Sequence, residues 1–259
     1  MHQTTESTQT LLPLGLALSG GGMRGLAHIG VIQALEEQGL MPDLTAAVSS
    51  GAIIGALYAS GLNAQEIAVC IANKKISSII RPHLSKRAIF DNKRIYKLLF
   101  DLFGNTRIEE LERSIEIIAT DLLRGEIHAF TSGSVCDAVW ASCTLPILYA
   151  PVVINQTPYA DGGLLKLLPV SVLRARCQYV IGSNVNPYAC QNKHLKDNLL
   201  AITERTYKLI VRSNARMDMQ QCDMLIMPHA LSDISLFESK KDQLIINMGY
   251  REAIKQLQA

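Results

Sequence analysis

Residues 44–61, LTAAVSSGAIIGALYASG, restrict the possible folds more than any other stretch of the chain. An apolar run breaks at two serines and a glycine and then resumes with helical character, so we predict a strand, a sharp turn and a helix. The turn Ser49-Ser50-Gly51 fits the second half of the nucleophile-elbow pattern G-x-S-x-G, with Ala47 at the position of the first glycine. Small residues there let the strand and helix backbones approach closely, so that a serine hydroxyl leans out of the sheet. Spacing to Gly51 selects Ser49 as the candidate nucleophile; an ordinary tight turn is the alternative.

A glycine-rich loop, SGGGMRG at residues 19–25, lies between a short apolar run (14–19) and a periodic segment (28–38), which predicts a strand, a loop and a helix. The loop also satisfies the dinucleotide pattern G-x-G-x-x-G, through Gly20, Gly22 and Gly25. That fingerprint needs an acid at the end of the next strand, whereas Asp43 precedes that strand. A glycine loop that opens a helix presents N–H groups to any anion, including the oxyanion of an acyl-transfer intermediate. We favour that function over a dinucleotide site; a packing turn is the structural alternative.

A carboxylate followed by two glycines, Asp161-Gly162-Gly163, comes directly after a short predicted strand. Such a triplet is typical of a simple turn. Its place at a strand end is also where α/β proteins carry catalytic loops, so Asp161 is a candidate functional residue.

The rest of the chain alternates between apolar runs and periodic stretches. We predict a hairpin (115–121 and 127–131), further strands (151–154, 158–160, 178–185, 224–227) and helices (63–75, 138–143, 197–220, 238–257). This alternation favours an α/β fold with one doubly wound, mostly parallel central sheet flanked by helices. Since no repeat or linker interrupts it, we expect a flexible N-terminal segment (1–13) and a single domain (14–259).

The composition excludes several classes of protein. With 259 residues, a net charge of +2 and 48% apolar residues, the chain can bury a full core and has no charge excess suited to nucleic acid. No uninterrupted apolar run reaches the roughly 18–20 residues of a membrane span, and the first ten residues lack the basic residues of a secretory signal. We therefore expect a cytoplasmic protein. The six cysteines form no C-x-x-C pair, and no carboxylate cluster has calcium-loop spacing, so we expect free thiols and no metal or cofactor.

Residues 74–97 carry many Lys and Arg residues against the single acid Asp91. A solvated surface is the usual meaning of such a run. If the substrate lies in an anionic bilayer, the same charges would favour peripheral contact with the membrane surface.

Three motifs occur in one order: GGGMRG (20–25), SSG (49–51) and DGG (161–163). In these motifs the chain resembles the patatin-like phospholipase family. The similarity extends to residues 52–61, 141–152, 168–170 and 249–250, and so covers nearly the whole chain.

The resemblance implies a lipid acyl hydrolase with a serine–aspartate dyad, in which Ser49 is the nucleophile and Asp161 its base. The glycine loop would form the oxyanion hole, chiefly through the N–H groups of Gly21 and Gly22, with Arg24 bracing the loop. The implied substrates are acyl esters of phospholipids or lysophospholipids. The site residues implied are Ser49 and Asp161, the loop Gly20, Gly21, Gly22, Met23, Arg24 and Gly25, the elbow Ala47, Ser50 and Gly51, and the dyad loop Gly162 and Gly163.

The chain departs from the family pattern in two places. Ala47 and Val48 replace a glycine and a commonly polar neighbour, and one methyl group at position 47 could crowd the turn. Lys166 and Leu167 replace an Asn-Pro pair that often follows the DGG motif. These departures bear on rate and substrate choice more than on reaction class.

Three alternatives remain open. A full triad would add His194 or His229, although neither lies in a recognisable catalytic loop, and His28 is better explained by packing. A transacylase would use the same acyl-enzyme with an alcohol acceptor. A lipid- or acyl-binding module without turnover would result if Ala47 and the altered segment after DGG disabled catalysis.

Overall fold

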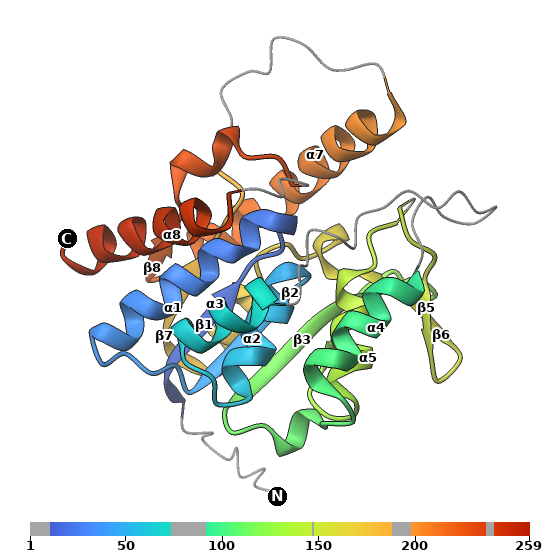
Figure 1. Cartoon of the computed structure of the whole chain (residues 1–259), viewed down its shortest axis with the longest axis horizontal. Helices are drawn as coiled ribbons and strands as arrows, with labels where there is room; N and C mark the ends of the chain where they lie inside the picture. Colours follow the sequence, from blue (N-terminus) through green and yellow to red (C-terminus); the bar gives the residue numbers. More distant parts are fainter. Residues whose placement is uncertain (1–10, 74–91, 147, 188–197, 237–240) are drawn as a thin grey trace, which may run out of the picture.

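A sheet of eight strands forms the centre of the part of the chain that the structure describes (Figure 1). The structure is a computed structural model that describes residues 11–73, 92–146, 148–187, 198–236 and 241–259. The strands are β1 (Leu12–Leu18), β2 (Leu44–Val48), β3 (Ser114–Asp121), β4 (Glu126–Phe130), β5 (Val152–Ile154), β6 (Thr157–Asp161), β7 (Cys177–Ser183) and β8 (Met224–Ile226). Their order is β5-β6-β3-β2-β1-β7-β8, with β4 also paired to β3. The strands β3, β2, β1, β7 and β8 are parallel, which confirms the predicted α/β class.

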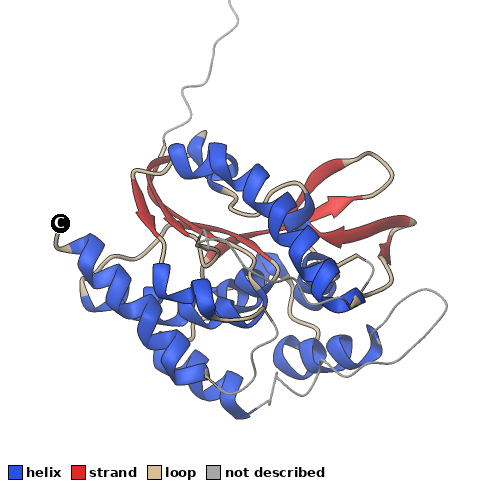
Figure 2. Ribbon diagram, turned by 90° about the horizontal axis from the view of Figure 1, so that it is seen from above, coloured by secondary structure: helices blue, strands red, loops and turns tan. Residues whose placement is uncertain are grey.

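Helices cover both faces of this sheet (Figure 2). They are α1 (Ala27–Glu37), α2 (Ser50–Ala59), α3 (Ala64–Asn73), α4 (Asn92–Phe103), α5 (Val135–Cys143), α6 (Val170–Arg174), α7 (Leu199–Gln220) and α8 (Asp242–Leu257). Leu16 and Leu18 of β1 pack into the cluster that contains α1, α2, α5 and α8, whereas Ala17 packs into the cluster beneath α6 and α7. Central strands are therefore buried on both sides, which explains why their sequences are continuous apolar runs.

Strand β3 brings the ends of two other strands together. Val48 at the end of β2 pairs with Ile118, and Asp161 at the end of β6 pairs with Ala119, the next residue of β3. Because β4 occupies the opposite edge of β3, β2 and β6 share one edge. Strand β2 runs parallel to β3 and β6 antiparallel, so their carboxyl ends meet head to head. The backbones that lead into Ser49 and out of Asp161 thus converge at one point.

The predicted elements are all found where they can be compared, with shifts at their ends. Strand β1 begins at Leu12, two residues before the apolar run 14–19 from which we predicted it and within the segment 1–13. The reason is tertiary: Leu12 pairs with Cys177 of β7 and donates its N–H to the Arg176 carbonyl. Helix α5 starts at Val135 rather than 138, because Ser134 caps it by accepting the Asp137 N–H.

No helix in the described ranges is both long enough and apolar enough to cross a bilayer.

Candidate active site

Ser49 occupies a strained turn between β2 and α2. Its φ of 53° and ψ of −123° lie in a region that costs energy for any residue with a side chain. The Ser49 N–H donates to the Ser142 hydroxyl at 2.8 Å, and Ser142 donates to the Ile118 carbonyl at 2.6 Å. Helix α5 and strand β3 therefore hold the turn in place. This is the geometry of a nucleophile elbow, with the first turn of α2 directly behind the serine.

The residues flanking Ser49 explain how the turn closes. A Cβ atom on Gly51 would lie 2.6 Å from the Ser19 carbonyl oxygen, so only glycine fits there. The neighbouring Ser50 hydroxyl is buried without a hydrogen-bond partner and lies against Gly25. Of the two adjacent serines, Ser49 is thus the one placed at the elbow.

The extra methyl group of Ala47 is accommodated by a glycine in the helix above it. Ala47 is fully buried, and its Cβ lies 3.2 Å from the position that a Cβ on Gly55 would occupy. The crowding expected from Ala47 is therefore relieved by Gly55, which sequence reasoning did not single out.

The glycine loop lies against Ser49. A Cβ on Gly20 would be 3.1 Å from the Ser49 Cβ, and Gly22 has a φ of +56°. Backbone hydrogen bonds anchor the loop at Gly20, whose N–H donates to the Leu167 carbonyl, and at Met23, whose N–H donates to the Leu236 carbonyl. Within the described structure, the N–H groups of Gly21 and Gly22 have no hydrogen-bond partner. They are available to an anion.

Arg24 is buried behind this loop. Its Nε donates to the Ile234 carbonyl at 2.7 Å and its Nη2 to the Ser232 carbonyl at 3.3 Å. These bonds tie the loop to the segment around the short helix His229–Asp233. The contacts are consistent with the bracing role that the resemblance implied for Arg24.

Asp161 is 1% exposed and lies at the end of β6. One carboxylate oxygen accepts the Gly163 N–H at 2.7 Å, which fixes the side chain. Gly162 packs so closely on the elbow that its Cβ would be 3.2 Å from a Val48 methyl group. The structure thus brings Asp161 and Ser49, 112 positions apart in the sequence, to one place.

The Cys143 thiol, which sequence analysis did not foresee as part of the site, forms a hydrogen bond with the Ser49 side chain. Burial raises the pKa of this thiol well above its usual range; the Asp161 carboxylate raises it further, and a hydrogen bond with the Ser49 side chain opposes them. The thiol is therefore neutral at ordinary pH.

Comparison with known proteins identifies the family of this chain. The patatin-like phospholipase family matches residues 16–174, more than half of the chain. The chain belongs to the patatin-like phospholipase family. An uncharacterised NTE family protein of Mycobacterium tuberculosis is 38% identical over 165 residues, covering 62% of this chain and 28% of that protein. Lysophospholipase NTE1 of Saccharomyces cerevisiae is 36% identical over 185 residues, covering 66% of this chain and 11% of that protein. The chain thus spans only a small part of these relatives.

A solved structure shares the patatin-like fold. The crystal structure of VipD from Legionella pneumophila superposes with a TM-score of 0.52 at 15% identity, covering 98% of this chain and 69% of that one. All three motifs that carried the family resemblance meet at the elbow. A phospholipase family and a lysophospholipase are thus among the proteins to which this chain is similar.

The three histidines weighed in the sequence analysis are His28, His194 and His229. His28 is buried: its Nε2–H donates to the Ser19 carbonyl, because a carbonyl can only accept, and its Nδ1 accepts from the Ser183 hydroxyl, both at 2.8 Å. It therefore packs under the glycine loop, as predicted. His229 is exposed at the start of a short helix, and His194 lies outside the described residues.

The second departure from the family pattern ties the Asp161 loop to α7. Lys166 forms an ion pair with buried Asp218 at 2.9 Å, and Leu167 packs beside Gly20. Asn214 donates to the Gly163 carbonyl at 2.8 Å and accepts the Leu167 N–H at 3.0 Å. Asn214 and Asp218 are hence supporting residues of the site that carried no local signal in the sequence.

The predictions about Asp43, the basic tract and the cysteines concern residues that the structure describes only in part. Asp43 pairs with Leu14 at the opposite end of β1 from the glycine loop, far from where a dinucleotide acid would be needed. In the basic tract, Lys93, Arg94 and Lys97 are exposed on α4, while residues 74–91 lie outside the described part. The cysteines that the structure describes are free thiols, with Cys190 outside it, and no cluster of metal-ligating side chains occurs among the described residues.

Proposed function

We propose that this chain hydrolyses fatty-acyl esters of phospholipids or lysophospholipids through Ser49 and Asp161. The observation that carries the proposal is the head-to-head meeting of β2 and β6 on β3, since Ser49 follows the end of β2 and the buried Asp161 ends β6. The N–H groups of Gly21 and Gly22, which have no hydrogen-bond partner in the described structure, belong to the loop whose Gly20 lies against Ser49, and they would supply electrostatic stabilisation where charge develops.

The chemistry follows from these positions. The Ser49 hydroxyl attacks the ester carbonyl carbon while its proton passes to the Asp161 carboxylate, and the resulting oxyanion is held by the N–H groups of Gly21 and Gly22. Collapse of this intermediate expels the alcohol, which takes the proton from Asp161 and leaves an acyl group on Ser49. Water then attacks the acyl-enzyme with Asp161 again as base, and this step releases the fatty acid and restores the serine.

The decisive experiment combines labelling with a fluorophosphonate probe and release of fatty acid from lysophospholipid. We expect Ser49→Ala to abolish labelling and both Ser49→Ala and Asp161→Asn to lower hydrolysis by about 10³-fold or more, as in other hydrolases that lose a dyad or triad member. Ser50→Ala is the matched control, because it makes the same change one residue away, at a buried hydroxyl without a partner. Substantial hydrolysis by Ser49→Ala, or its loss in Ser50→Ala, would refute the assignment.

The same experiment distinguishes hydrolysis from the two alternatives, a transacylase and a binding module without turnover. A transacylase would give acylated glycerol when glycerol is added, in place of free fatty acid. A binding module would bind lysophospholipid without labelling or product. A binding module is an alternative because crowding by Ala47 would disable catalysis. Gly55 makes room for the Ala47 methyl group, so this reason has less support.

A further inference from the structure

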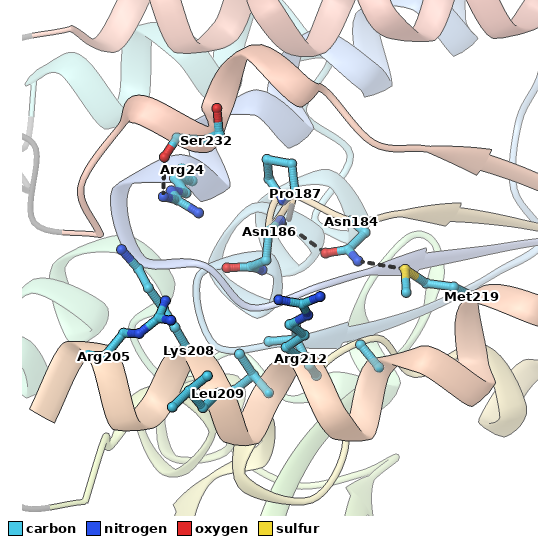
Figure 3. Close-up of a pocket in the computed structure, with 13 residues that line it drawn as sticks. Arg24, Asn184, Asn186, Pro187, Arg205, Lys208, Leu209, Arg212, Met219 and Ser232 are labelled. Carbon is cyan, nitrogen blue, oxygen red and sulfur yellow. Dashed lines mark hydrogen bonds between the residues drawn. The ribbon is translucent and has the colours of Figure 1, made fainter. Parts of the chain in front are cut away.

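A small pocket opens between the glycine loop and α7 (Figure 3). Its volume is about 60 Å³. The polar side chains that matter to its chemistry are Arg24, Arg205, Lys208, Arg212, Asn184 and Asn186. Among the described lining residues four are cationic and none is acidic, so the pocket carries a concentrated positive charge.

Three of the cations come from one side of α7. Arg205, Lys208 and Arg212 are spaced three and four residues apart, which places them on a single helix face. Figure 3 shows their side chains rising from α7 toward the loop that carries Arg24. Arg24, Lys208 and Arg212 have other interactions within the chain. The inference therefore rests on the summed charge of the lining and not on any unpaired group.

Two asparagines shape the opposite wall. The Asn186 amide donates to the Gly20 carbonyl at 2.6 Å, and the Asn186 N–H donates to the Asn184 side chain at 3.0 Å. Asn184 in turn contacts the Met219 sulfur at 3.2 Å. This wall is thus fixed before any ligand arrives.

Gly20 connects the pocket to the elbow. Its carbonyl is held by a pocket residue, Asn186, while its Cβ position faces the Ser49 Cβ at 3.1 Å. The pocket and the elbow thus adjoin the same residue of the glycine loop. In a glycerophospholipid only a few bonds of the glycerol backbone separate an acyl ester from the phosphate.

We propose that this pocket binds the phosphate of the lipid headgroup while the acyl ester lies at Ser49. The proposal rests on the hydrolase function above and adds the part of the substrate that the chain recognises. Arginine suits this role because its planar guanidinium pairs with two phosphate oxygens at once. Lipids without phosphate would lose this contact and be poorer substrates.

The first test compares phosphorylated and neutral substrates of one acyl chain: lysophosphatidic acid and monoacylglycerol. We expect the double substitution Arg205→Gln with Lys208→Gln to lower kcat/KM for lysophosphatidic acid by about 10-fold or more, chiefly through KM, since charge-assisted hydrogen bonds are lost. The rate with monoacylglycerol should stay within about 2-fold. Arg216→Gln removes one positive charge from the same helix outside this pocket, and it is the matched control for each single substitution, Arg205→Gln or Lys208→Gln. Equal losses on both substrates, or the same effect from Arg216→Gln, would overturn the proposal.

The second test measures binding without turnover. The Ser49→Ala protein is titrated calorimetrically with monomeric lysophosphatidic acid and, separately, with inorganic phosphate. Tight binding of the lysolipid that is weakened by the double substitution supports the headgroup site. Inorganic phosphate binding as tightly as the lysolipid would assign the pocket to free phosphate and overturn the proposal, as would lysolipid binding that the double substitution leaves unchanged. If the wild-type chain hydrolyses nothing but binding still depends on Arg205 and Lys208, the hydrolase function fails while the pocket assignment stands.

Discussion

At the scale of single residues, the elbow at Ser49 depends on contacts that its neighbours make with other elements. Ser49 keeps its φ of 53° because Ser142 holds its N–H and because Gly51 lets the helix approach the Ser19 carbonyl. Ala47 packs beneath α2 at a point where a Cβ on residue 55 would lie 3.2 Å from its own Cβ, so the glycine there leaves room for the methyl group. The departure at position 47 and the glycine at position 55 are therefore one packing unit.

This unit can be tested by a double-mutant cycle. A Cβ at position 55 would lie 3.2 Å from the Ala47 Cβ, which is tighter than ordinary contact. We expect Gly55→Ala to be more favourable, by about 1 kcal/mol, in the Ala47→Gly background than in the wild-type chain. Urea unfolding of the four proteins gives the coupling. Strict additivity would show that the two positions do not constrain each other.

At the scale of elements, α7 does more than cover the sheet. Asp218 pairs with Lys166 and accepts the Ser171 N–H at 2.8 Å, and Asn214 holds the Gly163 carbonyl. The helix thus clamps the segment that follows Asp161, and the same helix supplies the cations of the proposed phosphate pocket.

Removal of this clamp should be costly. We expect Asp218→Ala to lower the free energy of unfolding by about 3 kcal/mol, because it leaves a partly buried Lys166 and the Ser171 N–H without their partner. Arg107→Ala, which breaks an exposed ion pair with Glu109, should cost no more than about 1 kcal/mol. Chemical denaturation measures both. A loss for Asp218→Ala no larger than for Arg107→Ala would contradict the clamp.

At the scale of the whole molecule, His28 links the two central strands under the glycine loop. It bonds the end of β1 through Ser19 and the end of β7 through Ser183. Burial lowers its pKa from 6.5 to about 4, although the hydrogen bond to the Ser19 backbone works against that change. The folded chain therefore keeps this imidazole neutral in conditions where the unfolded chain protonates it.

The sign of the pH dependence follows. The contribution of neutral His28 is fully present above pH 6.5 and is lost as the pH falls toward about 4, which amounts to about 3 kcal/mol. Urea unfolding between pH 7.5 and 4.5 should show this loss in the wild-type chain and a smaller slope in His28→Gln, whose side chain does not titrate. Equal slopes in the two proteins would show that His28 is not the group responsible.

Much of the architecture follows from the sequence because its signals are local. The elbow, the glycine loop and the DGG turn are set by the sizes of adjacent residues, and the strands and helices by the period of their apolar positions. These signals predict that Ser49, the loop 20–25 and Asp161 belong to turns at strand ends, and the structure places them there.

Only the tertiary structure decided how those turns meet. The register of β2 and β6 on β3 brings Ser49 to Asp161, and no pattern within either strand encodes that register. The same holds for Gly55 against Ala47, for the Cys143 thiol at the Ser49 side chain, and for the cations of α7 beside the glycine loop. Each is a contact between segments far apart in the chain. The sequence by itself thus determined the kinds of turn and the order of the elements, whereas packing determined which side chains share a site.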